Sequence, residues 1–252
     1  MRRVFSCVTT RFANFIKLSK FLYSTRAGNM NLSPGKVVKL SVNDHKRVVE
    51  QAADSLLNGH IITVPTDTVY GIAGLAQNSE GISRIYNIKR RNLQNPIAIS
   101  VGCVQDFYKW SKVVVPQDLL EDLLPGPVTI VLERSSNLNT DLNPGTDLVG
   151  IRIPNHPFII DLAQKCGGPI ALTSANISST KSTLNIQEFE ELWPKLDLIC
   201  DGGQLGDTEF SRRGSTVVDL SVRGKYKIIR DGSAKKETVE LLEGKYSLVE
   251  NT

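Results

Sequence analysis

The chain has 252 residues, of which 40% are hydrophobic and 22% are charged, and its formal net charge is +4 at pH 7. This composition is that of an ordinary globular protein with one sizeable domain or two small ones. It excludes a membrane-spanning helix, because no apolar run approaches the ~20 residues that a bilayer requires. The four cysteines and three histidines are scattered, so neither a disulfide framework nor a zinc site is expected.

Most of the positive charge lies at the N-terminus. Residues 1–30 contain six Lys or Arg residues and no acidic residue, whereas residues 31–252 carry 24 basic and 26 acidic residues, a net charge of −2. The basic balance of the whole chain is therefore no evidence for nucleic-acid binding by the folded part. On a helix, Phe12 and Ile16 would share one face with Lys17 opposite, which is typical of a mitochondrial presequence.

We expect residues 1–30 to direct the protein to mitochondria, while initiation at Met30 would give a cytoplasmic form. The alternatives are a disordered basic tail and a membrane-surface helix, which would give peripheral membrane association. Residues 31–43 are expected to hold a linker and the first strand, 44–242 the folded domain, and 243–252 a C-terminal tail.

From residue 36 onward, apolar periodicity and Gly/Pro punctuation predict alternating strands and helices. The expected strands are 36–40, 61–64, 96–101, 128–132, 148–153, 169–172, 196–200, 215–220 and 226–230. The expected helices are 44–58, 79–90, 104–111, 117–124, 157–166, 185–193 and 237–242. The alternation predicts an α/β fold, and the β-rich tract at 196–230 predicts a mixed parallel and antiparallel sheet.

One stretch combines a hydroxyl-rich strand end with a cluster of cations. Thr66–Thr68 follow the second strand, Gly71 and Gly74 indicate a turn or a close approach to a ligand, and Lys89–Arg91 close the next helix. Ligands bind at the carboxyl ends of strands in open α/β sheets, and adjacent cations there suit a phosphate. Each feature also has a structural explanation, because cations favour a helix C-terminus and Pro-Thr-Asp-Thr is compatible with a plain capped turn.

Two further strands carry polar residues that suit a ligand. Arg152 lies within the apolar strand at 148–153, where a cation is costly unless it is paired. It is expected either to bind an anionic ligand or to pair with a carboxylate of the fold. The strand at 169–172 leads into Ser174 and Asn176, short donors that suit a phosphate at a strand end.

The string V-P-T-D-T-V-Y-G-I, followed by K-R-R and N-P-I-A-I, resembles the YrdC/Sua5 family, the threonylcarbamoyl-AMP synthases. Further segments match in order: P-G-P-V-T, G-I-R-I-P, S-A-N, S-T-V-V-D-L and I-I-R-D-G. Leu124 stands where the family has tryptophan, and Asp231 stands where it has proline. The resemblance covers about residues 45–242 and implies a single YrdC-like catalytic domain, with a twisted mixed sheet and flanking helices.

The resemblance implies a nucleotidyltransferase that converts L-threonine, bicarbonate and ATP, with Mg²⁺ accompanying ATP, into threonylcarbamoyl-adenylate and pyrophosphate. The adenylate would serve a separate tRNA threonylcarbamoyltransferase, giving N6-threonylcarbamoyladenosine at position 37 of tRNAs that read ANN codons. A contact with tRNA itself is a further expectation. Positioned cations would carry most of the catalysis, because the charge of the triphosphate must be neutralised.

The resemblance also implies the site residues. Lys89 and Arg91 would be catalytic through their charge. Threonine would be held by Thr68, Ser100, Arg152 and Ser215. ATP would be held by Lys89, Arg91, Asn95, Ser174, Asn176, Ser182 and Arg230. Ser100 stands where many family members have a histidine that contacts threonine.

Two other readings remain open at this point. A structured-RNA or tRNA-binding module without catalysis would need a broad basic surface, which the net charge of −2 over residues 31–252 does not favour. A carbamoyltransferase of the hydrogenase-maturation type would add an acylphosphatase domain and cysteine-rich zinc motifs. Neither addition fits in 252 residues with four scattered cysteines.

Overall fold

The computed structural model describes residues 35–251, and the presequence-like segment predicted at 1–30 lies outside these residues. The strands are β1 Lys36–Lys39, β2 Ile62–Val64, β3 Gly71–Leu75, β4 Ala98–Ser100, β5 Ser111–Lys112, β6 Val128–Arg134, β7 Leu148–Arg152, β8 Ile170–Ser174, β9 Leu198–Asp201, β10 Thr216–Asp219, β11 Lys225–Arg230 and β12 Val249–Glu250. The α-helices are α2 His45–Leu57, α3 Ser79–Lys89, α4 Phe107–Trp110, α5 Gln117–Leu123, α6 Pro157–Cys166 and α7 Lys235–Gly244. Three 3-10 helices, η1 Val104–Asp106, η2 Ile186–Lys195 and η3 Phe210–Arg213, complete the described part.

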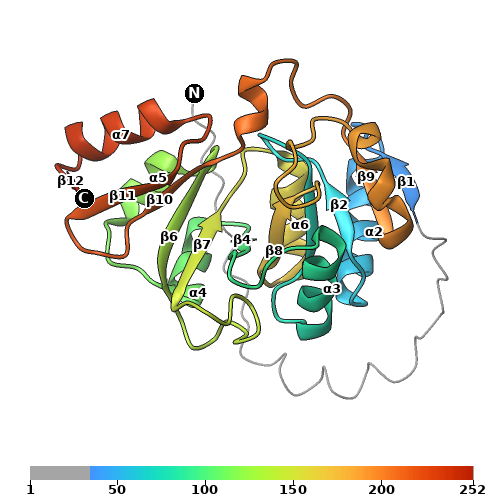
Figure 1. The fold of residues 1–252 in the computed structure, drawn as a ribbon, viewed down its shortest axis with the longest axis horizontal. Coiled ribbons are helices and arrows are strands. Elements are labelled where there is room, and N and C mark those ends of the chain that lie inside the picture. The colour runs from blue at the N-terminus through green and yellow to red at the C-terminus, as the bar shows by residue number, and fades with distance from the viewer. Residues whose placement is uncertain (1–34, 252) are drawn as a thin grey trace. The chain divides into compact units, whose positions relative to one another are not determined.

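The strands form one sheet in the order β1-β9-β2-β3-β8-β4-β7-β6-β10-β11-β12, with β5 pairing beside β6 (Figure 1). The sheet contains parallel pairs, such as β1 with β9 and β4 with β7, and antiparallel pairs, such as β3 with β8 and β6 with β7. The predicted α/β fold with a mixed sheet and flanking helices is therefore confirmed. In the described part of the chain, none of the helices has the length and hydropathy needed to span a bilayer.

The sequence prediction missed β3. Residues Gly71–Leu75 are a strand, antiparallel to β2 on one side and to β8 on the other, so the interpretation of Gly71 and Gly74 as turn residues was wrong. Glycine weakens a strand, but pairing on both sides supports this one. A Cβ atom at Gly71 would lie 2.6 Å from Leu172 Cδ1 on β8, so a larger residue at this position would require the Leu172 side chain to move.

Two other segments differ from the prediction. The helix expected at 185–193 is the 3-10 helix η2, interrupted by non-helical φ and ψ angles at Phe189 and containing Pro194, which cannot donate a backbone hydrogen bond. In the segment expected to be a tail, β12 pairs in parallel with β11. A two-residue strand has too little sequence for periodicity to reveal, so only its pairing defines it.

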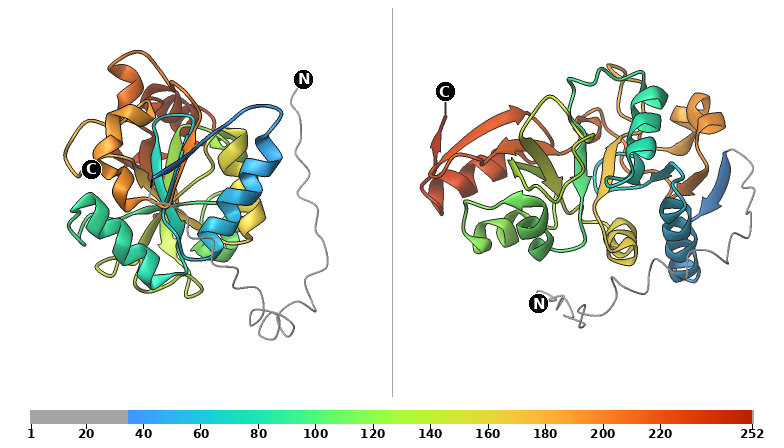
Figure 2. Two further views of the ribbon diagram at one scale, coloured as in Figure 1. Left: turned by 90° about the vertical axis from the view of Figure 1, so that its right-hand side faces the viewer. Right: turned by 90° about the horizontal axis from the view of Figure 1, so that it is seen from below.

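Helices cover the two faces of the sheet unequally. Alternate residues of β8 belong to different clusters: Ile170 and Leu172 pack with α2 and α6, and Ala171 packs in the cluster that contains α3, α5 and α7. Helices α2 and α6 lie side by side across β2, β3 and β8 from α3 and η2 (Figure 2). Side chains of β4, β7, β6 and β10 that point to the α2/α6 side line a cavity instead of packing under a helix.

Candidate active site

The cavity has a volume of about 530 Å³ and takes its walls from β3, β8, β4, β7, β6, β10 and β11. Thr129 and Val131 of β6 line it, and Ile130 between them is buried in the core on the opposite face. Its floor includes Gly71, Ala98 and Gly150. These small residues leave room for a ligand against the sheet.

Four arginines line the cavity and come from distant parts of the chain. Arg91 follows α3, Arg152 ends β7, Arg213 ends η3, and Arg230 ends β11. Among the described residues, Arg152 is the only one of the four with a carboxylate within ion-pair distance. The others therefore leave unbalanced positive charge at the wall, which suits a polyanionic ligand.

Arg152 joins the cavity to the turn after β2. Its Nη2 donates to Asp67 Oδ1 at 2.6 Å and approaches Thr68 Oγ1 at 3.4 Å. Its Nε is buried and has no hydrogen-bond partner among the described residues. Burial lowers the pKa of Arg152, and the charge of Asp67 opposes this shift. The expected pairing of Arg152 with a carboxylate of the fold is confirmed, whereas binding of an anionic ligand stays a prediction, for which Arg152 lies in the cavity wall.

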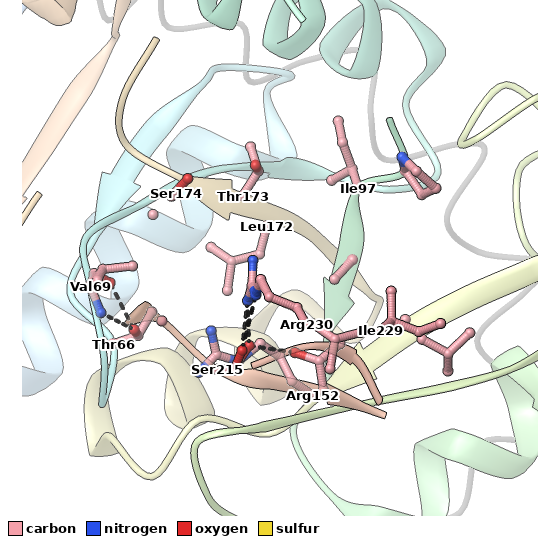
Figure 3. Close-up of a pocket in the computed structure, with 18 of the residues that line it drawn as sticks. Thr66, Val69, Ile97, Arg152, Leu172, Thr173, Ser174, Ser215, Ile229 and Arg230 are labelled. Carbon is pink, nitrogen blue, oxygen red and sulfur yellow. Dashed lines mark hydrogen bonds between the residues drawn. The ribbon is translucent and has the colours of Figure 1, made fainter. Parts of the chain in front are cut away.

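Arg230 and Ser215 lie side by side in the cavity (Figure 3). Arg230 Nη2 donates to Ser215 Oγ at 3.0 Å and to the Ser215 carbonyl at 2.8 Å, and Ser215 Oγ shares a hydrogen bond of 2.8 Å with Thr129 Oγ1. Burial lowers the pKa of Arg230, and the charges of Arg152 and Arg91 lower it further. This mutual repulsion means that an anion in the cavity would relieve an existing electrostatic strain.

Arg91 is held by the backbone of the loop before β4. Its Nε donates to the Asn95 carbonyl and its Nη2 to the Pro96 carbonyl, both at 2.9 Å. The preceding residue, Arg90, has φ 50° and ends α3 in the left-handed conformation. Because of this turn, Arg91 lies at the cavity whereas Lys89 lies within the core.

Lys89 does not line the cavity. Its side chain is 1% exposed, and Nζ donates to the carbonyl of Ser174, to the carbonyl of Asn176 at 2.7 Å and to Asn176 Oδ1 at 3.3 Å. Burial, with a smaller contribution from Arg91, lowers the pKa of Lys89 to about 7. Lys89 thus holds the S-A-N segment from behind, with its donors directed at the protein.

The structure brings six of the predicted residues together in the cavity wall: Arg91, Arg152, Ser174, Ser182, Ser215 and Arg230. The other predicted residues, Thr68, Lys89, Asn95, Ser100 and Asn176, lie outside the lining set. Thr68 and Asn176 are buried directly behind it, hydrogen-bonded to Arg152 and Lys89 respectively. Ser100 is fully buried opposite Arg152 in the β4–β7 pair, and its Oγ has no hydrogen-bond partner within residues 35–251.

Sequence reasoning missed Arg213, Thr129 and Asp219 as lining residues. Arg213 stacks on Phe210, with its guanidinium carbon 4.9 Å from the ring centroid, and belongs to a polar loop without periodicity. Asp219 lies two residues beyond Val217, which also faces the cavity, and its Oδ1 accepts a hydrogen bond from the Ser221 N–H at 2.8 Å. Side chains alternate between the two faces of a strand, so Ser215, which directly precedes β10, and Asp219 lie on the same face. Asp219 could have been predicted from the sequence if the face that points to the cavity had been known.

Comparison with known proteins identifies the family of the chain. The Sua5/YciO/YrdC family model, described as telomere recombination, matches residues 54–232. The chain belongs to this family. Threonylcarbamoyl-AMP synthase of Rattus norvegicus is 54% identical over 200 residues, which are 79% of this chain and 71% of the relative.

Solved structures of the family share the fold. P. abyssi Sua5 complexed with L-threonine is 28% identical and aligns with a TM-score of 0.73, covering 86% of this chain and 62% of that chain. E. coli YciO is 22% identical with a TM-score of 0.69, covering 79% of this chain and 97% of that chain.

Proposed function

We propose that the protein is a threonylcarbamoyl-AMP synthase, which joins L-threonine, bicarbonate and ATP to give threonylcarbamoyl-adenylate and pyrophosphate. The observation that carries this proposal is the cavity lined by four arginines, only one of which has a carboxylate partner among the described residues. A ligand with a carboxylate and several phosphates matches that charge. The 54% identity to the rat enzyme supports the same conclusion.

The end of the cavity near Arg152 suits threonine. Arg152 lines this part of the cavity, and a guanidinium binds a carboxylate through its planar set of donors. Thr129 and Ser215 supply hydroxyls beside it, and Leu172 supplies an apolar wall for a methyl group. P. abyssi Sua5, which is complexed with L-threonine, supports threonine as a ligand by similarity.

The remaining cations suit the triphosphate of ATP. Arg91, Arg213 and Arg230 would neutralise it, with Ser174 and Ser182 donating from the opposite wall. Mg²⁺ would travel with the phosphates, because the described residues contain no cluster of three metal-ligating side chains and Asp219 is the carboxylate that lines the cavity. Such a cation is bound chiefly through substrate phosphates and water.

The chemistry follows from this arrangement. The threonine amine loses a proton and forms a carbamate with bicarbonate, releasing water. A carbamate oxygen then attacks the α-phosphorus of ATP, and the bond to the bridging oxygen of the β-phosphate breaks, releasing pyrophosphate. The arginines stabilise the charge that develops on the phosphate oxygens. The carbamate is already an anion, so the attack itself requires no proton transfer to the protein.

The proposed product would serve tRNA modification. A separate threonylcarbamoyltransferase would move the threonylcarbamoyl group to adenosine 37 of tRNAs that read ANN codons, and this protein would contact that enzyme or the tRNA. The N-terminal residues 1–30 support a mitochondrial location, with a form beginning at Met30 in the cytoplasm. These assignments of partner and place rest on the chemistry of the product and on the N-terminal composition.

The test is product formation with purified protein. Pyrophosphate release and threonylcarbamoyl-adenylate should both require L-threonine, bicarbonate and ATP together. Replacing threonine with serine should reduce the rate by roughly 10–200-fold, the range expected for one methyl group in an apolar pocket. A protein that binds structured RNA but releases no pyrophosphate with all three substrates would instead support the non-catalytic RNA-binding reading.

A further inference from the structure

Asp67 lies just outside the cavity and connects two segments that form its Arg152 end. Oδ1 of Asp67 accepts the Arg152 Nη2 hydrogen bond at 2.6 Å, and Oδ2 accepts from the Asn155 backbone N–H at 2.8 Å. The side chains of Asp67 and Arg152 are both 9% exposed. One carboxylate therefore fixes the turn after β2 against the segment between β7 and α6.

The turn that carries Asp67 is itself well ordered by hydrogen bonds. Thr66 Oγ1 accepts from the Thr68 N–H at 3.1 Å and the Val69 N–H at 3.2 Å, and it donates to the Val69 carbonyl at 2.7 Å. Figure 3 shows Thr66 and Val69 joined in this way beside the cavity. Asp67 thus lies in a turn whose local hydrogen bonds are satisfied, and this turn fixes the position of its carboxylate.

The contacts of Arg152 divide into two groups. Nη2 is directed to Asp67 and Thr68, whereas Nε is buried and no partner for it occurs in the described part of the chain; the residue itself lines the cavity. A long side chain would otherwise have considerable rotational freedom, and a guanidinium must be correctly oriented to bind a carboxylate through its planar set of donors. The pairing with Asp67 removes that freedom before a ligand arrives.

We propose that Asp67 is a positioning residue for the proposed reaction: it holds the Arg152 guanidinium at the cavity wall in the orientation that binds the carboxylate of threonine. Asp67 does not touch the substrate, and it acts through Arg152. The inference rests on the proposed function, because it takes the amino-acid substrate to be the ligand of Arg152. Loss of Asp67 is therefore expected to affect recognition of one functional group of threonine, its carboxylate.

The test compares L-threonine with L-threonine amide, which lacks the negative carboxylate, by calorimetric titration of the wild-type protein and Asp67→Asn. Asparagine keeps the size of the side chain but removes its charge and one acceptor oxygen. Asp67→Asn should weaken threonine binding about tenfold and leave the binding of threonine amide within about twofold. The Michaelis constant for threonine should rise correspondingly, while that for ATP stays unchanged.

The chain offers a matched control in Asp197. Its Oδ2 accepts from Arg84 Nη2 at 2.8 Å and from the Ile61 backbone N–H at 2.7 Å, so it makes the same kinds of contact as Asp67, but neither Asp197 nor Arg84 lines the cavity. Asp197→Asn should lower thermal stability without changing the preference for threonine over its amide. A merely structural role for Asp67 would give the same pattern in Asp67→Asn.

Several outcomes overturn the proposal. Equal weakening of threonine and threonine amide in Asp67→Asn would assign Asp67 a structural role. Tighter binding of threonine would show that repulsion between Asp67 and the substrate carboxylate outweighs positioning. If Asp67→Asn does not fold, Asp67→Glu, which moves the charge by one methylene, supplies the same comparison. A wild-type protein that binds no threonine would overturn the inference and the proposed function together, whereas the other outcomes leave the function intact.

Discussion

Truncation of Arg152 should affect both stability and threonine binding, and the two effects can be separated. Arg152→Ala leaves Asp67 as an unpaired carboxylate with 9% side-chain exposure. Breaking a buried ion pair costs about 3–5 kcal/mol. For a domain of this size each kcal/mol lowers the melting temperature by about 2–4 °C, so a decrease of ~6–20 °C is expected.

The binding effect should be selective for threonine. A charge-assisted, partly buried contact contributes about 1.5–3 kcal/mol, or roughly tenfold to a hundredfold in affinity. Arg152→Ala should therefore weaken threonine by that factor and change ATP affinity much less. Arg152→Lys keeps a cation beside Asp67 and should recover part of the stability. It should not restore threonine affinity fully, because an ammonium lacks the planar fork of donors.

Calorimetric titration of each substrate, together with a melting curve, decides between the alternatives. The titrations must be made well below the melting temperature of each variant, so that only folded protein is compared. Equal weakening of threonine and ATP in proportion to lost stability would assign Arg152 to the fold alone. Unchanged threonine affinity in folded Arg152→Ala would falsify the placement of the substrate carboxylate at this residue.

Arg91→Ala should keep the fold and weaken ATP binding about tenfold, because the guanidinium lines the cavity and has no carboxylate partner among the described residues. A wild-type affinity for ATP in this variant would contradict the prediction. Burial lowers the pKa of Lys89 from 10.5 to about 7, so between these pH values the unfolded chain binds more protons than the folded chain. The free energy of unfolding should therefore rise with pH over this range. Urea unfolding at pH 7 and at pH 9 should show this rise in the wild-type protein and a smaller rise in Lys89→Met. A reporter fused to residues 1–30 should enter mitochondria and a chain starting at Met30 should not, whereas a diffuse cytosolic reporter would contradict the presequence interpretation.

The sequence by itself determined most of the helices and strands and the family. Local signals sufficed for this: apolar runs at period two or 3.6, glycine and proline at the ends, and ordered motifs around Thr66–Thr68, Arg152 and Ser215. The cationic residues of the candidate site could also be predicted, because charged residues are unusual in or beside apolar helices and strands. The buried or exposed face of each element could be predicted wherever its periodicity was clear.

Only the tertiary structure decided which of these residues meet. Strand β3 exists because β2 and β8 pair with it on both sides, a non-local condition that its glycines conceal. The K-R-R run contributes Arg91 to the cavity and Lys89 to the core, because the left-handed conformation of Arg90 redirects the chain between them. The pairing of Asp67 with Arg152 spans 85 positions in sequence. Sequence patterns report the local preferences of a segment, whereas side-chain contacts depend on strand order and register, which pairing between distant segments sets.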